Sequence, residues 1–285
     1  MGQDVQLMKN ALTVDLEDYF HVSVFERHIS RKYWDYLPVR VEESVAKVLD
    51  LLSRHNVKAT FFVLSWVAER LGKLVQEIRR DGHEIASHGY DHRLAYEMDP
   101  GDFRKDIRRS KATLEDVTGE RVNGYRATSY SIIRNNLSYL RILAEEGYRY
   151  DSSIFPIYHD RYGIPDWERF PKIVREAGAE ICEIPPSTFR VFGQNLPVGG
   201  GGYLRLFPVQ FLAHCIGKIN KVEKKPAVIY VHPWELDPCQ PRIKIPPLSS
   251  FRHYNNIKNT ECKLDYLLNR FRFCPMRELA CLERG

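Results

Sequence analysis

The chain lacks several features that would assign it to a large class of proteins. No hydrophobic run in its 285 residues approaches the length of a membrane span, and residues 1–10 lack the apolar core of a secretion signal. Lysine and arginine form no long runs, and the formal charge of +5 is small and scattered. We therefore expect a cytoplasmic protein with no membrane span and no nucleic-acid partner. An acidic or sugar-polymer substrate stays compatible with this charge.

Paired cysteines and linker-like sequence are also missing. The six cysteines are widely spaced and contain no CxxC pair, which is typical of reduced, mostly structural thiols. No linker-like run and no internal repeat divides the chain, and 44% of its residues are hydrophobic, enough for a large core. We therefore expect a single domain over residues 1–285, with a core over 11–235 and a C-terminal extension over 236–285.

What the chain does have is an alternation of strand-like and helix-like segments, which favours a parallel α/β architecture. The strand-like segments cover residues 12–15, 59–64, 83–87, 122–126, 147–150 and 227–231. The helix-like segments cover residues 41–55, 67–81, 100–117, 137–146 and 263–270. Residues 156–171 are rich in aromatics, prolines and charges, which predicts a long surface loop.

Two histidines four residues apart form the most informative motif. His88 and His92 follow a short strand-like segment. At this spacing two imidazoles can project from one side of a helical turn and bind one divalent ion, with a carboxylate as third ligand. Histidine pairs at this spacing also occur by chance on protein surfaces, so the pair alone leaves both interpretations open.

A cluster of acids supplies candidate carboxylates. Asp15, Glu17 and Asp18 come directly after an apolar, β-branched run that predicts a buried strand. Acids this close repel one another unless a cation or a shared proton relieves them. The alternative is a solvated loop in which Asp18 caps a following helix. Because a core strand leads straight into the cluster, we favour a functional site.

The candidate residues share one position relative to the predicted strands. Four polar residues follow such strands at their carboxyl ends: Asp15, His88, Arg126 and His232. In barrels and open α/β sheets this end carries the active site. The sequence therefore predicts that these four side chains meet.

These motifs together resemble the polysaccharide deacetylase family, the NodB-homology hydrolases. Residues 13–18 resemble its acid-rich first motif, and residues 87–92 match its His-x-x-x-His second motif. Residues 124–130 resemble its arginine-containing third motif, and residues 231–232 its closing Leu-His motif. The resemblance extends over roughly residues 11–235.

Further sequence segments are similar to one subgroup of this family, the deacetylases associated with exopolysaccharide gene clusters (PEP-CTERM-associated). The similar stretches are residues 14–20, 199–203, 232–235 and 251–254. The resemblance implies a distorted (β/α) barrel of the NodB-homology type with fewer than eight regular strands. It also implies hydrolysis of N-acetyl groups from a polysaccharide or its lipid-linked precursor, so that the partner is an N-acetylated glycan.

The resemblance also implies roles for individual residues. A divalent metal, expected to be Zn²⁺, is held by His88, His92 and a carboxylate, and it polarises the acetyl carbonyl. Asp15 is the general base, and Arg126 pairs with it and keeps it ionised. His232, protonated, donates to the leaving amine nitrogen.

The chain departs from the family pattern in two ways. The usual first motif has two adjacent aspartates, but here Leu16 intervenes, and either Glu17 or Asp18 could be the carboxylate ligand. The usual Asp/Trp motif that orients the catalytic histidine is not clear, and Asp166 and Trp167 are candidates by residue type only.

Other residues are assigned by chemical type. Three aromatic residues are candidates for stacking on sugar rings, although most aromatics in such a chain belong to the core: Tyr130, Tyr203 and Trp234. We predict a flexible flap over the substrate at residues 199–202, because glycine permits unusual backbone angles. We expect His83 and His253 to be structural.

Two other functions fit parts of the sequence. One is a metal-independent amidohydrolase acting on a small ureide-type amide, because such relatives also depart from the paired aspartates. The retained histidine pair argues against it. The other is an inactive carbohydrate-binding scaffold, which would be expected to lose the base or a metal ligand. All the candidate residues are present, so we predict an active metal-dependent hydrolase.

Overall fold

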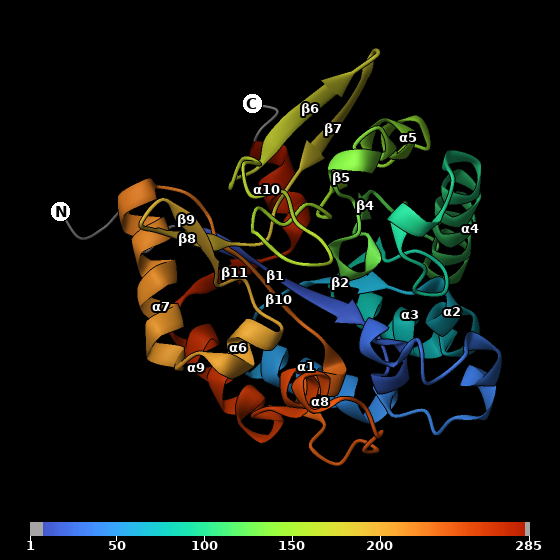
Figure 1. Ribbon diagram of the computed structural model, residues 1–285, viewed down its shortest axis with the longest axis horizontal. Coiled ribbons are helices and arrows are strands. Elements are labelled where there is room, and N and C mark those ends of the chain that lie inside the picture. The colour runs from blue at the N-terminus through green and yellow to red at the C-terminus, as the bar shows by residue number, and fades with distance from the viewer. Residues whose placement is uncertain (1–7, 283–285) are drawn as a thin grey trace.

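The computed structural model describes residues 8–282, which form one mostly parallel sheet covered by helices (Figure 1). The strand order is β10-β1-β2-β3-β4-β5-β7-β6, and β11 also pairs with β1. The strands are β1 (Lys9–Leu16), β2 (Thr60–Val63), β3 (Glu84–Ser87), β4 (Gly124–Tyr125), β5 (Tyr150–Asp151), β6 (Lys172–Glu176), β7 (Ala179–Glu183), β10 (Val228–Val231) and β11 (Arg272–Cys274). All pairs are parallel except β6 with β7. Within residues 8–282 the ladder does not close, because β10 and β6 lie at its two ends.

The helices follow the strands as the alternating sequence pattern predicts. They are α1 (Val41–Arg54), α2 (Ser65–Arg70), α3 (Gly72–Arg80), α4 (Pro100–Thr118), α5 (Tyr139–Glu145), α6 (Gly202–Leu206), α7 (Val209–Lys218), α8 (Pro247–Tyr254), α9 (Thr260–Arg270) and α10 (Met276–Leu282). Short 3-10 turns and a small antiparallel hairpin of β8 (Thr188–Val191) and β9 (Gln194–Pro197) complete the fold. The single helix predicted over residues 67–81 is instead two helices, because Leu71 leaves the helical conformation at φ −120°, ψ 42°.

The ends of α4 show how local sequence fixes a helix. The Asp99 side chain accepts a hydrogen bond from the Asp102 N–H at 2.8 Å, and Pro100 occupies the first turn. Gly119 ends the helix at φ 69°, in the left-handed region that glycine adopts without strain. These start and stop signals explain why the predicted bounds of this helix were nearly correct.

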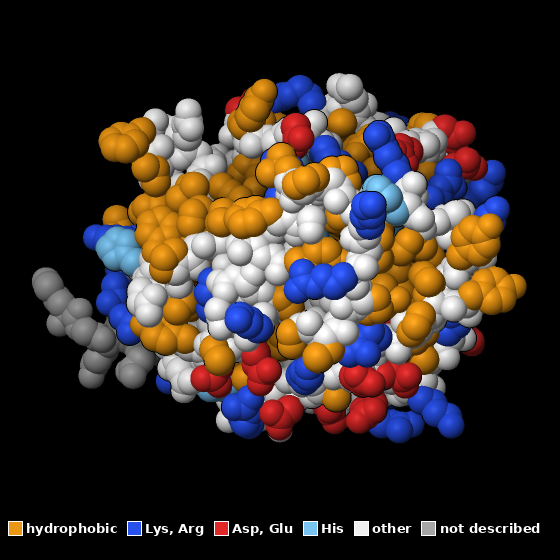
Figure 2. Space-filling view, turned by 60° about the horizontal axis from the view of Figure 1, so that its bottom comes forward, with side chains coloured by type: hydrophobic (Ala, Val, Ile, Leu, Met, Phe, Trp, Pro, Cys, Tyr) orange, Lys and Arg blue, Asp and Glu red, His pale blue; other side chains and the backbone are white. Residues whose placement is uncertain are grey.

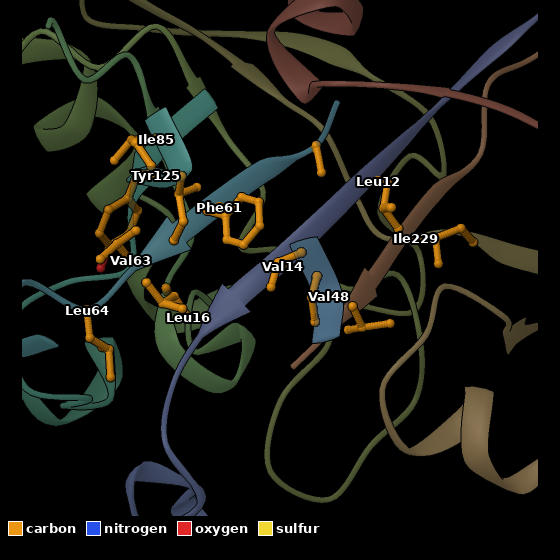
Figure 3. Close-up of a cluster of buried hydrophobic side chains, with 14 of the residues drawn as sticks. Leu12, Val14, Leu16, Val48, Phe61, Val63, Leu64, Ile85, Tyr125 and Ile229 are labelled. Carbon is orange, nitrogen blue, oxygen red and sulfur yellow. The ribbon is translucent and has the colours of Figure 1, made fainter. Parts of the chain in front are cut away.

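Alternating residues of β1 face two different environments. Leu12, Val14 and Leu16 are buried in the main hydrophobic cluster, and Figure 3 shows Val14 beside Val48 of α1. Ala11 belongs to a separate buried cluster on the other face of the strand. Asp15 shares that second face, so the strand itself turns its carboxylate away from α1.

The C-terminal segment packs on this second face. Met276 and Leu279 of α10 lie in the same cluster as Ala11. The helix is anchored at its start, where the Met276 N–H donates to Thr60 Oγ1 at 2.7 Å and the Arg277 N–H to the Glu84 carboxylate at 3.1 Å. The segment after residue 271 therefore contributes both a strand and a buried helix to the same sheet.

The glycine run does not form the predicted flexible flap. Gly200 pairs with Tyr230 of β10 in an isolated parallel bridge. The Tyr230 N–H donates to the Gly199 carbonyl at 2.6 Å, and the Gly201 N–H donates to the Tyr230 carbonyl at 3.1 Å. The run is held by hydrogen bonds on both sides, so glycine serves here to allow close approach of two backbones.

The surface mixes apolar and charged side chains. Figure 2 shows hydrophobic side chains gathered on the left and toward the right of one face, with Lys and Arg between them and acids along the lower edge. In the part of the chain that the structure describes, no helix combines the length and the apolar character needed to cross a bilayer.

Substitution Gly200→Ala is expected to destabilise the protein by about 2–4 kcal/mol. An added Cβ would lie 1.9 Å from the Tyr230 carbonyl oxygen, and the residue has φ +129°. Thermal denaturation measures the effect. Gly217→Ala is the control, because its Cβ meets nothing within 4 Å and a helical Gly→Ala change stabilises by up to about 1 kcal/mol. Equal melting temperatures for the two variants would contradict the close approach.

Candidate active site

The centre of the site is an ion pair between β1 and the segment after β4. Arg126 Nη1 lies 2.6 Å from Asp15 Oδ1 and also donates to Thr13 Oγ1 at 2.8 Å. Arg126 is completely buried, and Asp15 is nearly so at 2% exposure. Its guanidinium carbon lies 4.1 Å from the centre of the Phe62 ring. The geometry therefore holds the Asp15 carboxylate in one orientation.

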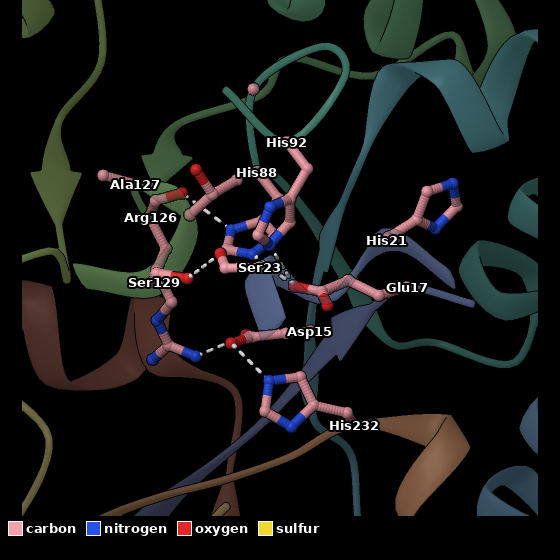
Figure 4. Close-up of polar contacts among 12 residues, drawn as sticks. Asp15, Glu17, His21, Ser23, His88, His92, Arg126, Ala127, Ser129 and His232 are labelled. Atoms are coloured by element: carbon pink, nitrogen blue, oxygen red, sulfur yellow. Dashed lines mark hydrogen bonds and ion pairs between the residues drawn. The ribbon is translucent and has the colours of Figure 1, made fainter. Parts of the chain in front are cut away.

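The other oxygen of this carboxylate faces a histidine. His232 follows β10, and its Nε2 lies 3.8 Å from Asp15 Oδ2 (Figure 4). The opposite ring nitrogen, Nδ1, donates to Glu235 Oε2 at 2.9 Å. Glu235 is buried and also accepts a hydrogen bond from Arg205 Nε at 2.6 Å. Asp15 and His232 thus face one another, and each is held from behind by a buried, oppositely charged group.

The buried charges shift the protonation of the histidine. Burial disfavours the imidazolium, but the hydrogen bond and charge of Glu235 raise the pKa of His232 to about 9. Burial acts to raise the pKa of Glu235, yet Arg205 and His232 lower it to about 2. His232 is therefore a cation at neutral pH and can donate a proton from Nε2.

Neither Glu235 nor Arg205 was identified from the sequence. A signal for Glu235 was present, because it stands three residues after His232, the spacing of a capping box. Its Oε2 indeed accepts from the His232 backbone N–H at 2.9 Å as well as from the ring. Arg205 carried no such signal, because it comes from α6, 30 positions before Glu235 in the printed sequence.

A second cluster lies beside this pair. Glu17 Oε1 is 3.0 Å from His88 Nε2 and 3.2 Å from His92 Nε2. One ligand atom from each of the three residues lies within 4.8 Å of the others, and all three side chains are buried. Burial acts to raise the pKa of Glu17, but the neighbouring His92 and His88 hold it well below its ordinary value.

These three residues fit a divalent metal. His88 Nδ1 donates to the Arg126 carbonyl oxygen at 2.7 Å, which leaves a lone pair on Nε2 toward Glu17. A metal-binding histidine characteristically donates its other ring N–H to a carbonyl or carboxylate in this way. Two imidazoles and one carboxylate are a common ligand set for catalytic zinc. Figure 4 shows the three side chains pointing toward one another.

The four-residue spacing predicted that the two histidines lie on a helical turn, and this prediction is wrong. Residues 88–92 form a loop after β3. Gly89 has φ +76° and His92 has φ +60°, an uncommon conformation for a side chain of this size. The two rings converge because the chain reverses between them.

Asp18, which the sequence left as an alternative ligand, lies outside this cluster. Its Oδ1 accepts from the Tyr19 N–H at 2.8 Å. Its Oδ2 accepts from the N–H groups of Arg40 and Val41 at 2.7 and 2.9 Å, at the start of α1. Burial raises its pKa to about 6 despite these bonds. The helix-capping interpretation was therefore the correct one for Asp18.

The suggested Asp/Trp pair at residues 166 and 167 is also wrong. Asp166 is exposed and forms an ion pair with Arg134 on the surface. Trp167 packs at the edge of the main hydrophobic cluster. Glu235 occupies the position behind His232 that the Asp/Trp pair was expected to take, because the short turn after β10 brings it there.

The aromatic candidates differ in how much surface they leave for a sugar. Tyr130 packs against Phe155 and Tyr230 and is 5% exposed. Trp234 is also 5% exposed, and it stacks on His232 with ring centres 5.1 Å apart. Little of either ring can contact a substrate. Tyr203, on α6, is half-buried and stays a prediction.

The two histidines expected to be structural are hydrogen-bonded inside the fold. His83 Nδ1 accepts from the Ala59 N–H at 3.1 Å. His253 Nε2 lies 2.9 Å from Gln240 Oε1, and its ring stacks on Trp234 at 4.4 Å. Burial lowers the pKa of His83 to about 4 and that of His253 to about 3, so both are neutral.

Parts of the chain are similar to known protein families. Residues 33–150 match a family model described as polysaccharide deacetylase, and residues 152–281 match one described as a domain of unknown function (DUF3473). A peptidoglycan-N-acetylglucosamine deacetylase of Bacillus cereus is 33% identical over 97 residues, 34% of this chain and 35% of that protein. The match thus spans about a third of this relative's length. Residues 33–150 therefore resemble a polysaccharide deacetylase domain.

Solved structures share the fold at low sequence identity. A crystal structure assigned as a polysaccharide deacetylase of Mycobacterium smegmatis has a TM-score of 0.66 and 19% identity, covering 100% of this chain and 92% of that one. The Puue allantoinase structure has a TM-score of 0.58 and 16% identity, covering 95% and 88%. The α/β fold is therefore that of the NodB type.

Glu17→Gln is expected to lose a bound metal that Asp18→Asn retains. Of these two acids, Glu17 faces the two histidines, whereas Asp18 accepts hydrogen bonds from backbone N–H groups. Weakening this cap in Asp18→Asn should lower the free energy of unfolding by about 1 kcal/mol. Elemental analysis after dialysis against zinc measures the first effect and thermal denaturation the second. Metal loss in Asp18→Asn with retention in Glu17→Gln would reverse the assignment.

In the metal-free protein, His232 is expected to titrate near pH 9, the value to which its pKa is raised. Because the pKa is raised, the imidazolium and its bond to Glu235 stabilise the fold fully below the ordinary pKa of 6.5, and this stabilisation is lost as the pH rises from there through about 9. NMR titration should show a pKa lower by about one pH unit or more in Glu235→Gln. His253, which stays neutral, is the internal control. An unchanged pKa in the variant would exclude Glu235 as the cause.

Proposed function

We propose that this protein is a metal-dependent hydrolase that removes N-acetyl groups from a glycan. The observation that carries the proposal is the adjacency of two sets of residues. Asp15 lies between Arg126 and His232, and Glu17 follows it by two residues into the histidine cluster. Amide hydrolysis needs a base for water and an acid for the leaving nitrogen, and this arrangement offers both.

Each residue of the first set has one task. Asp15, held in one orientation by its ion pair with Arg126, accepts a proton from the attacking water. His232, a cation at neutral pH, donates its Nε2 proton to the amine as the carbon–nitrogen bond breaks. Glu235 keeps the ring oriented and charged. Asp15 thereby gains one proton and His232 loses one as acetic acid and a free amine are released, and exchange of one proton with solvent at each residue restores both for the next cycle.

The second set, Glu17, His88 and His92, is suited to hold a metal ion that acts as a Lewis acid. Glu17, His88 and His92 would hold the divalent ion, which polarises a carbonyl and makes water more acidic when bound. The Arg126 carbonyl fixes the tautomer of His88, so the residue that holds the base also orients a ligand.

A small cavity beside the ligands suits an acetyl group. Its volume is about 170 Å³, and it is lined by Phe20, His21, Glu26, Ile29, Ser30, Arg31, Trp34 and His92. Phe20 and Trp34 give one side of this cavity an apolar lining beside His92, which can take a short substituent such as a methyl group.

Finer features of the function rest on the resemblance alone. We propose zinc as the metal, and as substrate an exopolysaccharide or its lipid-linked precursor. The amidohydrolase alternative gains no specific support, because likeness to the allantoinase concerns the fold. The cluster of two histidines and a glutamate favours the metal-dependent reaction over the ureide-type one.

Asp15→Asn is expected to keep the bound metal but reduce acetate release from N-acetylglucosamine oligomers by about 10²–10⁴-fold, since the general base is lost. His88→Ala is expected to lose both. Asp15→Asn also leaves Arg126 unpaired, at a cost of about 3–5 kcal/mol, so assays should run well below its melting temperature.

The matched control for this stability loss is Glu146→Gln. Glu146 forms ion pairs with Arg104 and Arg108 far from the site. We expect it to lower the melting temperature while acetate release stays at the wild-type rate. Full turnover by Asp15→Asn would refute the base assignment.

A further inference from the structure

A second pair of acids lies buried next to the site and has no role in the reaction above. Asp151 ends β5 and Glu183 ends β7, and the two are register partners in adjacent parallel strands. Neither exposes any surface. Two neighbouring carboxyl groups at this depth repel one another if both are ionised, and sharing one proton removes the repulsion.

The hydrogen bonds show which residue carries the proton. Both Asp151 oxygens accept, from the Ser153 Oγ–H at 2.6 Å and from the Ser153 N–H at 3.1 Å. Glu183 Oε1 accepts from the Ile154 N–H at 2.9 Å, while Oε2 has no donor among the described residues. Burial and the Asp151 charge raise the pKa of Glu183 well above its ordinary value. Glu183 is therefore the protonated partner and Asp151 the ionised one.

The turn that this pair holds is the one that binds Arg126. The Ser152 carbonyl accepts from Arg126 Nε at 3.3 Å, and Ser152 Oγ accepts from Nη2 at 3.0 Å. Ser153 Oγ, which donates to the acid pair, also accepts from the Ala127 N–H at 2.7 Å. Adjacent residues of an extended segment point to opposite faces. Ser153 therefore bonds to Asp151 on one side of the turn, while Ser152 contacts the guanidinium on the other.

We propose that Asp151 and Glu183 are positioning residues for Arg126. By sharing one proton they fix the turn at residues 152–154, and the turn aims the guanidinium at the catalytic base. The inference rests on the proposed function for its kinetic consequence, but the placement of Arg126 can be measured without any substrate.

Two substitutions of one residue separate the roles of shape and proton. In Glu183→Gln the amide N–H replaces the acid O–H and the amide oxygen still accepts from Ile154, so kcat on N-acetylglucosamine oligomers should stay within about twofold of wild type. In Glu183→Leu both bonds are lost, and kcat should fall by about tenfold or more with KM and metal content unchanged. An equal loss in both variants would overturn the shared-proton role.

Glu84→Leu is the matched control. Glu84 is another buried carboxyl group on the same sheet, but it bonds to Thr60 and to the Arg277 N–H, away from Arg126. It should lower the melting temperature and leave kcat of the folded protein unchanged. If Glu183→Leu does the same, the pair is only structural and the proposal fails. If Glu183→Leu does not fold, Ser153→Ala removes the linking hydroxyl and should give the same selective loss of kcat.

NMR of the guanidinium group keeps this test independent of the reaction. In the wild type the Arg126 side-chain N–H signals, assigned by their loss in Arg126→Lys, should exchange slowly with solvent. They should also be unchanged in Glu183→Gln and Glu84→Leu. Faster exchange in Glu183→Leu or Ser153→Ala supports the proposal, and unchanged exchange overturns it. Absence of acetate release by the wild type would instead count against the proposed function.

Discussion

The buried guanidinium of Arg126 is the constraint on which the site depends. It has no exposed surface, so its charge must be balanced by Asp15 and its remaining donors must find acceptors on Thr13 and Ser152. Removing one partner of such a pair costs about 3–5 kcal/mol. That requirement ties β1 to the segments after β4 and β5. The backbone carbonyl of Arg126 also orients His88. Arg126 therefore contacts both the Asp15–His232 pair and the cluster of Glu17 and the two histidines.

The Asp15–His232 pair and the histidine cluster stay distinct because Asp15 and Glu17 bind different partners. Asp15 and Glu17 are separated by one residue, and the Glu17 N–H bonds back to the Asp15 carbonyl at 3.0 Å in a tight turn. The first carboxylate faces a guanidinium and an imidazolium, and the second faces two imidazoles. Asp18 turns to the start of α1 instead. Three acids within four residues thus have three different sets of partners, which fits the proposed base and metal ligand and the observed helix cap.

Much of the fold followed from the sequence because its elements have clear local signals. The buried strands β1, β2 and β10 are runs of apolar residues, and α4 has a capping aspartate and a terminal glycine. Residues 172–197 were missed. The strands β6 and β8 are partly exposed and carry charged residues, so their hydrophobic alternation is weak. Only pairing with β7 and β9 makes them strands, and such pairing is not visible in local sequence.

By itself the sequence determined which residue types stand at the carboxyl ends of the strands, because hydrophobic strands and the polar residues after them are local patterns. Tertiary structure decided which carboxylate meets the histidines and which acid stands behind His232. The tight turn after Asp15 decides that Glu17, and not Asp18, points toward the histidines. Arg205 contacts Glu235 from a separate helix, α6. Those outcomes depend on buried charges finding partners across the fold, an energetic condition that no single segment can satisfy.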